Sequence, residues 1–173
     1  MTLHETIQYI NYKWNAKGRH GTHSPFVYAF IEEVLMRAES KGGLVKNIKH
    51  YFQFEDIFEY SKTQEGMPTF LPVVMDNPVE DSRRKTATLG GFSRLYIFSP
   101  EATNPLFFKE LLSKMRPEDV LLITSLYKTK AHTSQWEVIK NDQKVKLSMD
   151  LFDIGLLFFR EEFKEKQEFV LKY

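Results

Sequence analysis

The chain has 173 residues, of which 42% are hydrophobic, 14% aromatic and 27% charged, and its net charge is +1. This length favours a single domain, residues 1–173, with enough apolar side chain for a substantial core. The near-neutral charge argues against nucleic acid and membrane surfaces as partners. The absence of cysteine excludes disulfides, thiolate metal sites and cysteine nucleophiles.

The start of the sequence lacks the features of an export signal. Residues 1–15 contain neither a basic region nor an unbroken apolar run. The longest apolar stretches, such as residues 156–159, are far shorter than the roughly 20 residues that a membrane helix needs. We therefore expect a cytoplasmic protein.

Residues 1–43 predict a helical segment. Apolar side chains at positions 3, 7, 10 and 14 recur at helical spacing, and Gly18 is placed to end this first helix. Ser24 and Pro25 predict a sharp start for a second helix, because serine is a good N-cap and the missing N–H of proline costs nothing at the first helical position. Gly42 and Gly43 are expected to close the segment.

The middle of the chain is less regular. Residues 44–66 have apolar side chains, including Ile57 and Phe58, that suggest helical pieces broken by turns. Residues 69–75 (TFLPVVM) predict a strand, and Pro72 places it at a sheet edge because proline cannot donate to a ladder. Residues 76–88 are polar and predict a surface loop.

The second half alternates strands and helices. Residues 94–98, 104–115 and 119–124 predict a strand, a helix and a second strand, which form a right-handed unit with parallel strands. A helix near 132–140, a strand at 145–152, a turn at 153–155 and a returning strand at 156–160 follow, and residues 168–172 add a last strand. The sequence therefore predicts an α/β fold with a parallel centre and an antiparallel end.

Two stretches resemble small bacterial class I methyltransferases that depend on S-adenosylmethionine (SAM). Residues 20–26 (HGTHSPF) resemble the HGxHSPF stretch near the N-terminus of these enzymes. Residues 136–160 resemble their C-terminal part, with a Trp-bearing helix, a strand ending in Asp-Leu-Phe and a Phe-Phe-Arg strand. The resemblance implies a reduced Rossmann-like sheet over residues 66–173, with an antiparallel C-terminal hairpin and N-terminal helices in front of it.

The chain departs from this family at the cofactor site. The family implies a glycine-rich turn that leads from a strand into a helix and holds SAM. No such pattern precedes residue 94, and Gly90 and Gly91 stand before a strand, which is the wrong context. Acidic stretches of the family align with residues 99–102 (SPEA) and 124–127 (TSLY), which leave most of its carboxylates and imidazoles unmatched.

These departures lead us to expect no cofactor and a degenerate, non-catalytic relative that binds a small ligand, a partner or a related methyltransferase. One alternative is an active methyltransferase in which Gly90 and Gly91, or residues 66–78, form an atypical SAM site. A second alternative is an assembly protein that forms a homodimer through the exposed edge of its shortened sheet. We expect strand 94–98 to lie at that edge, unless strand 69–75 covers it.

Candidate ligand-binding residues lie in two regions. The loop with His20, His23 and Ser24 is suited to line a cleft, and a metal site there is disfavoured because no third ligand is near. Ligands of open α/β sheets bind at the carboxyl ends of parallel strands. This rule selects a second set of polar residues, namely Ser99, Glu101, Asn104, Thr124, Ser125 and Tyr127. Loop polarity and helix capping explain the same residues without a ligand.

Two charged groups have simpler explanations than a function. Asp150 and Asp153 flank a turn, and a turn role for Asp153 is favoured over paired catalytic carboxylates. Residues 83–85 (RRK) are interpreted as part of a solvated loop, because nucleic-acid binding needs a larger basic face.

Overall fold

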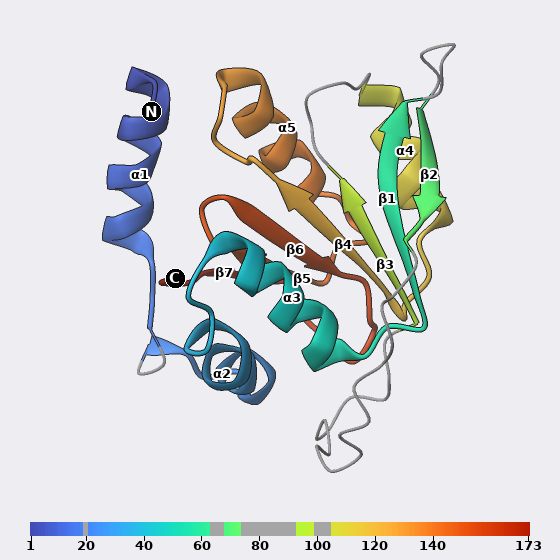
Figure 1. The fold of residues 1–173 in the computed structure, drawn as a ribbon, viewed down its shortest axis with the longest axis horizontal. Coiled ribbons are helices and arrows are strands. Elements are labelled where there is room, and N and C mark those ends of the chain that lie inside the picture. Colours follow the sequence, from blue (N-terminus) through green and yellow to red (C-terminus); the bar gives the residue numbers. More distant parts are fainter. Residues whose placement is uncertain (19–20, 63–67, 74–92, 99–104) are drawn as a thin grey trace.

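The structure is a computed structural model that describes residues 1–18, 21–62, 68–73, 93–98 and 105–173. These residues form a seven-stranded mixed sheet with helices on both of its faces (Figure 1). The predicted α/β class is confirmed. Among the described residues, no helix is both long and apolar enough to cross a membrane.

The helices and strands have the following bounds. The helices are α1 (Leu3–Asn15), α2 (Pro25–Phe30), the π-helix η2 (Ile31–Leu35) that continues it, α3 (Lys41–Phe52), α4 (Pro105–Lys114) and α5 (Lys130–Lys140). The strands are β1 (Asp56–Lys62), β2 (Pro68–Pro72), β3 (Arg94–Phe98), β4 (Asp119–Thr124), β5 (Leu147–Asp150), β6 (Ile154–Phe158) and β7 (Gln167–Val170).

The sheet has the order β2-β1-β3-β4-β6-β5-β7. Strands β1, β3 and β4 are parallel and form its centre. Strand β6 runs antiparallel to β4 and to β5, and β7 is parallel to β5. The predicted parallel unit of β3, α4 and β4 and the predicted antiparallel hairpin of β5 and β6 are both confirmed.

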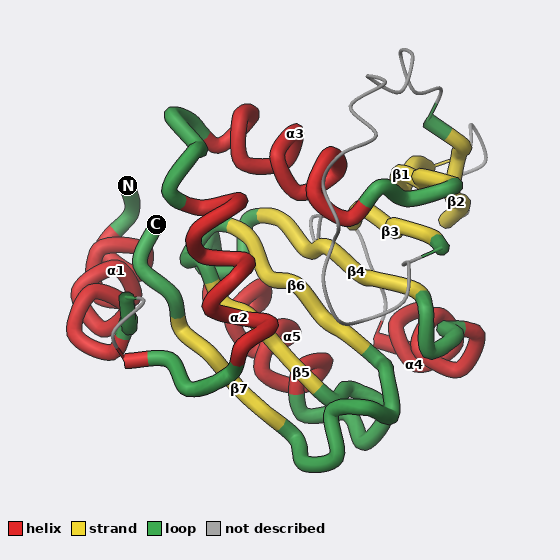
Figure 2. The backbone as a smooth tube through the Cα atoms, turned by 90° about the horizontal axis from the view of Figure 1, so that it is seen from below, coloured by secondary structure: helices red, strands yellow, loops and turns green. Residues whose placement is uncertain are grey.

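Two apolar clusters cover the two faces of the sheet. One joins α2, η2 and α3 to side chains such as Leu95 and Phe158, and the other joins α4 and α5 to side chains such as Leu121 and Leu157. Figure 2 shows α2 and α3 in front of the strands and α5 behind them. Helix α1 lies beyond β7 at one end of the sheet, where Lys17 bridges to Leu171 (Figures 1 and 2).

The helix starts follow the predicted capping residues more closely than the helix ends. Ser24 accepts a hydrogen bond from the Val27 N–H, and Pro25 begins α2 as predicted. Two expected helix ends are wrong. Helix α1 ends before Gly18, at Asn15, and the two glycines 42–43 lie in the first turn of α3. Ser40 caps α3 by accepting from the Gly43 N–H, and this N-cap starts the helix despite the glycines.

The helical interpretation of residues 57 and 58 is wrong. Ile57 is buried and Phe58 is half-buried within β1, which pairs with β2 on one side and with β3 on the other. The Phe58 ring stacks on Tyr96 of β3, a cross-strand contact that a helix would not allow. Strand β3 is therefore an interior strand, which corrects the expected edge at residues 94–98. The edge position predicted from Pro72 is confirmed, because β2 pairs only with β1 among the described strands.

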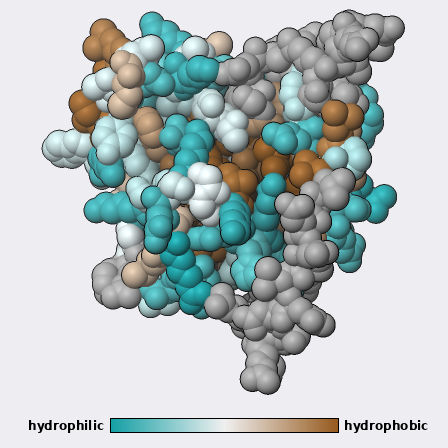
Figure 3. Space-filling model, in the orientation of Figure 1, coloured by the Kyte–Doolittle hydropathy of each residue, from teal (hydrophilic) through white to brown (hydrophobic). Residues whose placement is uncertain are grey.

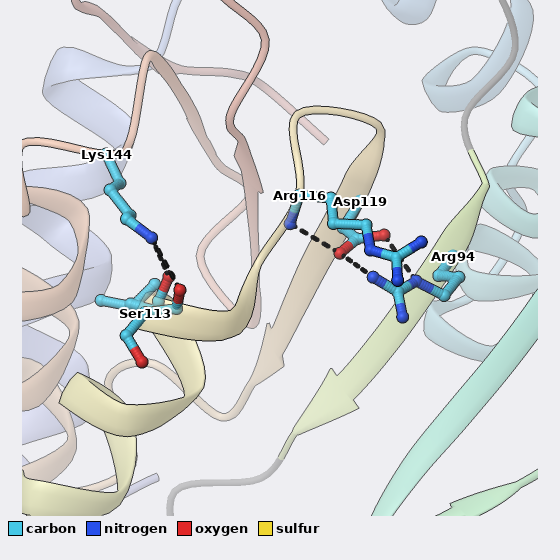
Figure 4. Close-up of polar contacts among 6 residues, drawn as sticks. Arg94, Ser113, Arg116, Asp119 and Lys144 are labelled. Carbon is cyan, nitrogen blue, oxygen red and sulfur yellow. Dashed lines mark hydrogen bonds and ion pairs between the residues drawn. The ribbon is translucent and has the colours of Figure 1, made fainter.

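A buried ion pair joins the starts of β3 and β4 (Figure 4). Arg94 Nε and Nη2 donate to the two carboxylate oxygens of Asp119 at 2.8 and 2.7 Å, and the Arg116 N–H donates to the same carboxylate at 2.8 Å. Asp119 is fully buried. Figure 4 also shows Lys144, which donates to the Ser113 carbonyl at 2.8 Å and so caps the end of α4.

We expect Arg94→Met to lower the free energy of unfolding by about 3 kcal/mol, because Asp119 would remain buried without its cation. Urea denaturation measures this change. The matched control is Lys114→Met, which breaks the exposed i,i+4 pair with Glu110 and is expected to have no measurable effect. Equal stabilities of the two variants would contradict a stabilising role for the Arg94–Asp119 pair.

We expect Gly155→Ala to destabilise the fold by about 1–3 kcal/mol, because a Cβ on this β6 residue would lie 2.6 Å from the Trp136 ring. Gly42→Ala is the control. A Cβ there meets nothing within 4 Å, and alanine favours the helix over glycine. Thermal unfolding of both variants compares the two sites, and a Gly155→Ala protein as stable as the wild type would show that Trp136 can shift at no cost.

Candidate functional site

The described carboxyl ends of β3 and β4 lie side by side. Thr124, the last residue of β4, donates a hydrogen bond to the Phe98 carbonyl at the end of β3 at 3.4 Å. The next residue, Ser125, has a φ of 59°, in the left-handed region that non-glycine residues rarely adopt. Its N–H donates to the Asp153 carbonyl at 2.6 Å, which ties the end of β4 to the turn between β5 and β6.

A buried carboxylate lies at this edge. Asp150 ends β5, and only 6% of its surface is exposed. The Tyr127 hydroxyl donates to one of its oxygens in a short hydrogen bond, and the Phe152 N–H donates to the other at 2.8 Å. We name this group, together with Ser125 and His132, the Asp150 cluster.

Burial raises the pKa of the two acidic groups, Asp150 and Tyr127. It raises the pKa of Asp150, while the hydrogen bonds from Tyr127 and Phe152 and the charge of Lys140 oppose the rise. Burial, followed by the Asp150 charge, also raises the pKa of Tyr127. The phenol therefore keeps its proton and shares it with the carboxylate.

Helix α5 supplies two further polar groups. His132 is buried, and its Nδ1 lies 3.0 Å from the Ser125 carbonyl. A carbonyl only accepts, so Nδ1 is assigned as the donor. The Trp136 indole N–H is buried without a hydrogen-bond partner in the described part of the chain. It lies close to Asp150 and Tyr127, where it weakly opposes the rise in the pKa of each.

Aromatic rings cover the cluster from outside. Phe152 has a φ of 70°, and its ring stacks on Tyr127 with centroids 5.3 Å apart. Tyr9 and Tyr12 of α1 contact the same Phe152 ring at 5.1 and 5.3 Å. The N-terminal helix therefore packs on Phe152, which in turn covers Tyr127 beside Asp150.

Polar contacts hold α1 in this position. The Tyr12 hydroxyl donates to the Leu171 carbonyl at 2.5 Å and accepts from the Tyr173 N–H at 3.2 Å. Burial raises the pKa of Tyr12 to about 12, so this contact persists over the whole neutral range. At the other end of the helix, His4 Nε2 lies 2.9 Å from the Thr133 hydroxyl of α5.

The structure brings together only part of the predicted set. Thr124, Ser125 and Tyr127 meet at the carboxyl edge of the sheet, as predicted. Ser24 acts as an N-cap and His23 is exposed. Ser24 starts α2, on the sheet face opposite to the one where Tyr127 and α5 pack, so the two regions do not form one site. Some predicted positions lie outside the described residues, namely His20, residues 83–85, Gly90, Gly91, Ser99, Glu101 and Asn104.

Sequence reasoning missed Asp150 and His132 as members of the cluster. Asp150 ends a strand of four buried residues, LSMD, and a carboxylate at the end of such a strand was the available signal. His132 carried a weaker signal, since it lies three residues after Thr129, the N-cap of α5. No group of three potential metal-ligating side chains occurs in the described part of the chain.

The fold defines an α/β protein with three central parallel strands, and polar side chains lie at the carboxyl end of β4. Comparisons with protein-family models, curated proteins and solved structures found no match to this chain.

The raised pKa of Asp150 predicts a pH-dependent stability. Between the ordinary value of 3.8 and the raised folded value, the folded protein binds a proton that the unfolded chain has lost. The free energy of unfolding therefore falls as the pH rises through this window. We expect Asp150→Asn to flatten this slope, as measured by urea denaturation from about pH 4 to pH 8.

The matched control for this test is Asp153→Asn, which removes a half-exposed carboxylate from the same turn. It is expected to keep the wild-type slope. A slope that survives in Asp150→Asn would assign the pH dependence to another group.

Proposed function

We propose that this chain is a non-catalytic relative of the class I SAM-dependent methyltransferases, and that it acts by binding a ligand or a partner instead of transferring a methyl group. The HGTHSPF segment and the C-terminal pattern support the relationship. The main observation against methyltransferase activity is the path of the chain after β1.

Strand β1 is followed by another strand, β2. Lys62 at the end of β1 pairs with Pro68 at the start of β2, and the two strands are antiparallel. The element that follows β1 among the described residues is therefore the neighbouring strand of the same sheet. In a methyltransferase the corresponding strand would lead into a helix whose free N–H groups and positive dipole end favour a bound cofactor. In the described part of the chain, β1 is followed by β2 and not by such a helix N-terminus.

The described end of β4 also lacks the groups for methyl transfer. Thr124 and Ser125 are neutral, and Tyr127 retains its proton. The nearest carboxylate, Asp150, is buried beneath Phe152 and α1 instead of facing an open cleft. A general base must reach the proton that it removes. This edge therefore offers no accessible general base, which argues against catalysis.

Assembly with a second copy is a second candidate role, and exposed apolar side chains on α1 favour it. The alternative of an active enzyme with an atypical site requires SAM to bind. Titration of the cofactor distinguishes that alternative from our proposal.

We expect SAM and its demethylated product to give no binding heat in calorimetry and no saturation transfer in ligand-observed NMR, at concentrations that detect dissociation constants up to about 1 mM. The thermal midpoint should also stay constant, because a ligand stabilises only a fold that binds it. Saturable binding of SAM would overturn the proposal. If the Gly90→Val or Gly91→Val protein then lost SAM binding, the site would lie at these two glycines. The control is Gly18→Val, which should retain SAM binding.

A further inference from the structure

Helix α1 presents an apolar stripe to the outside of the molecule. Leu3, Ile7, Ile10 and Trp14 are 79%, 48%, 51% and 85% exposed. At 100° per residue they share one side of the helix, roughly opposite to Tyr12 and Ala16, which are buried. Figure 3 shows hydrophobic side chains at the outer border of the molecule, over α1 at the left of the view.

We propose that this stripe is a self-association surface on which α1 of a second copy packs antiparallel, giving a two-fold homodimer. The inference rests on α1 alone and does not require the proposed function. Its test and the SAM titration therefore fail independently.

The spacing of the stripe supports a second copy as the occupant. The steps between its residues are four, three and four, the seam spacing of paired helices. This order reads the same from either end of the helix. An antiparallel copy therefore places Leu3 opposite Trp14 of the second copy and Ile7 opposite its Ile10, which is the self-complementarity that a two-fold interface requires.

The exposed area is sufficient for a small interface. Four such side chains present roughly 500 Å² of apolar surface, near the upper range for patches on monomers. Two facing stripes would bury roughly 1,000 Å², which reaches the lower limit for a specific interface. We therefore expect a dissociation constant in the micromolar range, about 1–100 µM.

The charges around the stripe also favour a second copy. Thr6 and Asn11 flank it and are neutral. Lys13 lies over the Tyr9 and Tyr12 rings at 5.2 and 5.9 Å, towards the body of its own chain. No like charges therefore meet across the seam. A membrane-surface helix would need a basic polar face free to meet lipid headgroups, but α1 carries one lysine and no arginine, and its His4 and Tyr12 contact the rest of the chain.

Helix α1 is held in place by contacts within its own chain. A capping box closes its start, because Thr2 accepts from the Glu5 N–H while Glu5 accepts from the Thr2 N–H. Tyr12 anchors its end. A helix that is already ordered loses little entropy when it binds.

Sedimentation of the full chain over a concentration series tests the proposal. The wild type should shift from one to two chains per particle within the micromolar range. Ile7→Glu combined with Ile10→Glu should weaken the dimer at least about 10-fold, because it places carboxylates on the seam. The matched control is Val138→Glu on α5, a 73% exposed apolar residue outside the stripe, which should leave the dimer intact. Unchanged circular dichroism shows that each variant folds.

The orientation of the helices has its own test, because the chain has no cysteine. In an equimolar mixture of Ile7→Cys and Ile10→Cys proteins, oxidation should give mainly mixed disulfides. Predominant disulfides between two copies of the same variant would overturn antiparallel pairing.

A wild type that stays monomeric at about 1 mM would overturn the proposal itself, as would a dimer unaffected by the double Glu variant. A protein that stays monomeric and binds lipid vesicles only through this stripe would also overturn the proposal, because the stripe would then be a membrane-binding surface.

Discussion

The buried ion pair between Arg94 and Asp119 aligns the starts of the central strands β3 and β4. Arg94 pairs directly with Asp119 in the register of β3 and β4, so Phe98 and Ile123 are aligned four residues later. Parallel strands aligned at their starts also end together, and the Thr124 hydrogen bond to the Phe98 carbonyl joins the two ends. The carboxyl edge that could receive a ligand is therefore defined by an interaction at the opposite edge of the sheet.

Part of the same edge is covered by the chain's own side chains. The β5–β6 hairpin brings Asp150 beside Tyr127, and Phe152 turns back over that pair in a left-handed conformation. Helix α1 then adds Tyr9 and Tyr12. In open α/β sheets a ligand binds at this edge, and here aromatic rings cover the part of it that holds Tyr127 and Asp150. A ligand that approaches Asp150 from this side must displace Phe152 or α1, and that displacement would reduce its affinity.

The sequence predicted the elements whose order depends on local patterns. The strand, helix and strand over residues 94–124 alternate clearly, and Ser24 and Pro25 locate a helix start within one residue. Strand β1 was not predicted, because it lies in the sheet beside β3, where Phe58 stacks on Tyr96, a partner far along the chain. The strand-end rule found Thr124, Ser125 and Tyr127. It could not find the burial of Asp150, because that depends on how the β5–β6 hairpin sets Asp150 beside Tyr127 and on α1, which packs on Phe152 from the other end of the chain.

Helix α1 connects the two surfaces discussed above. Its buried side carries Tyr12, which contacts Phe152 over the Asp150 cluster, and its outer side carries the proposed seam. A second copy packed on the seam would hold α1 in place and so keep the cluster closed. A ligand that displaced α1 would in turn disrupt the seam. Because linkage between two binding events is reciprocal, dimer formation and ligand entry at this edge would oppose one another, with α1 as the shared element.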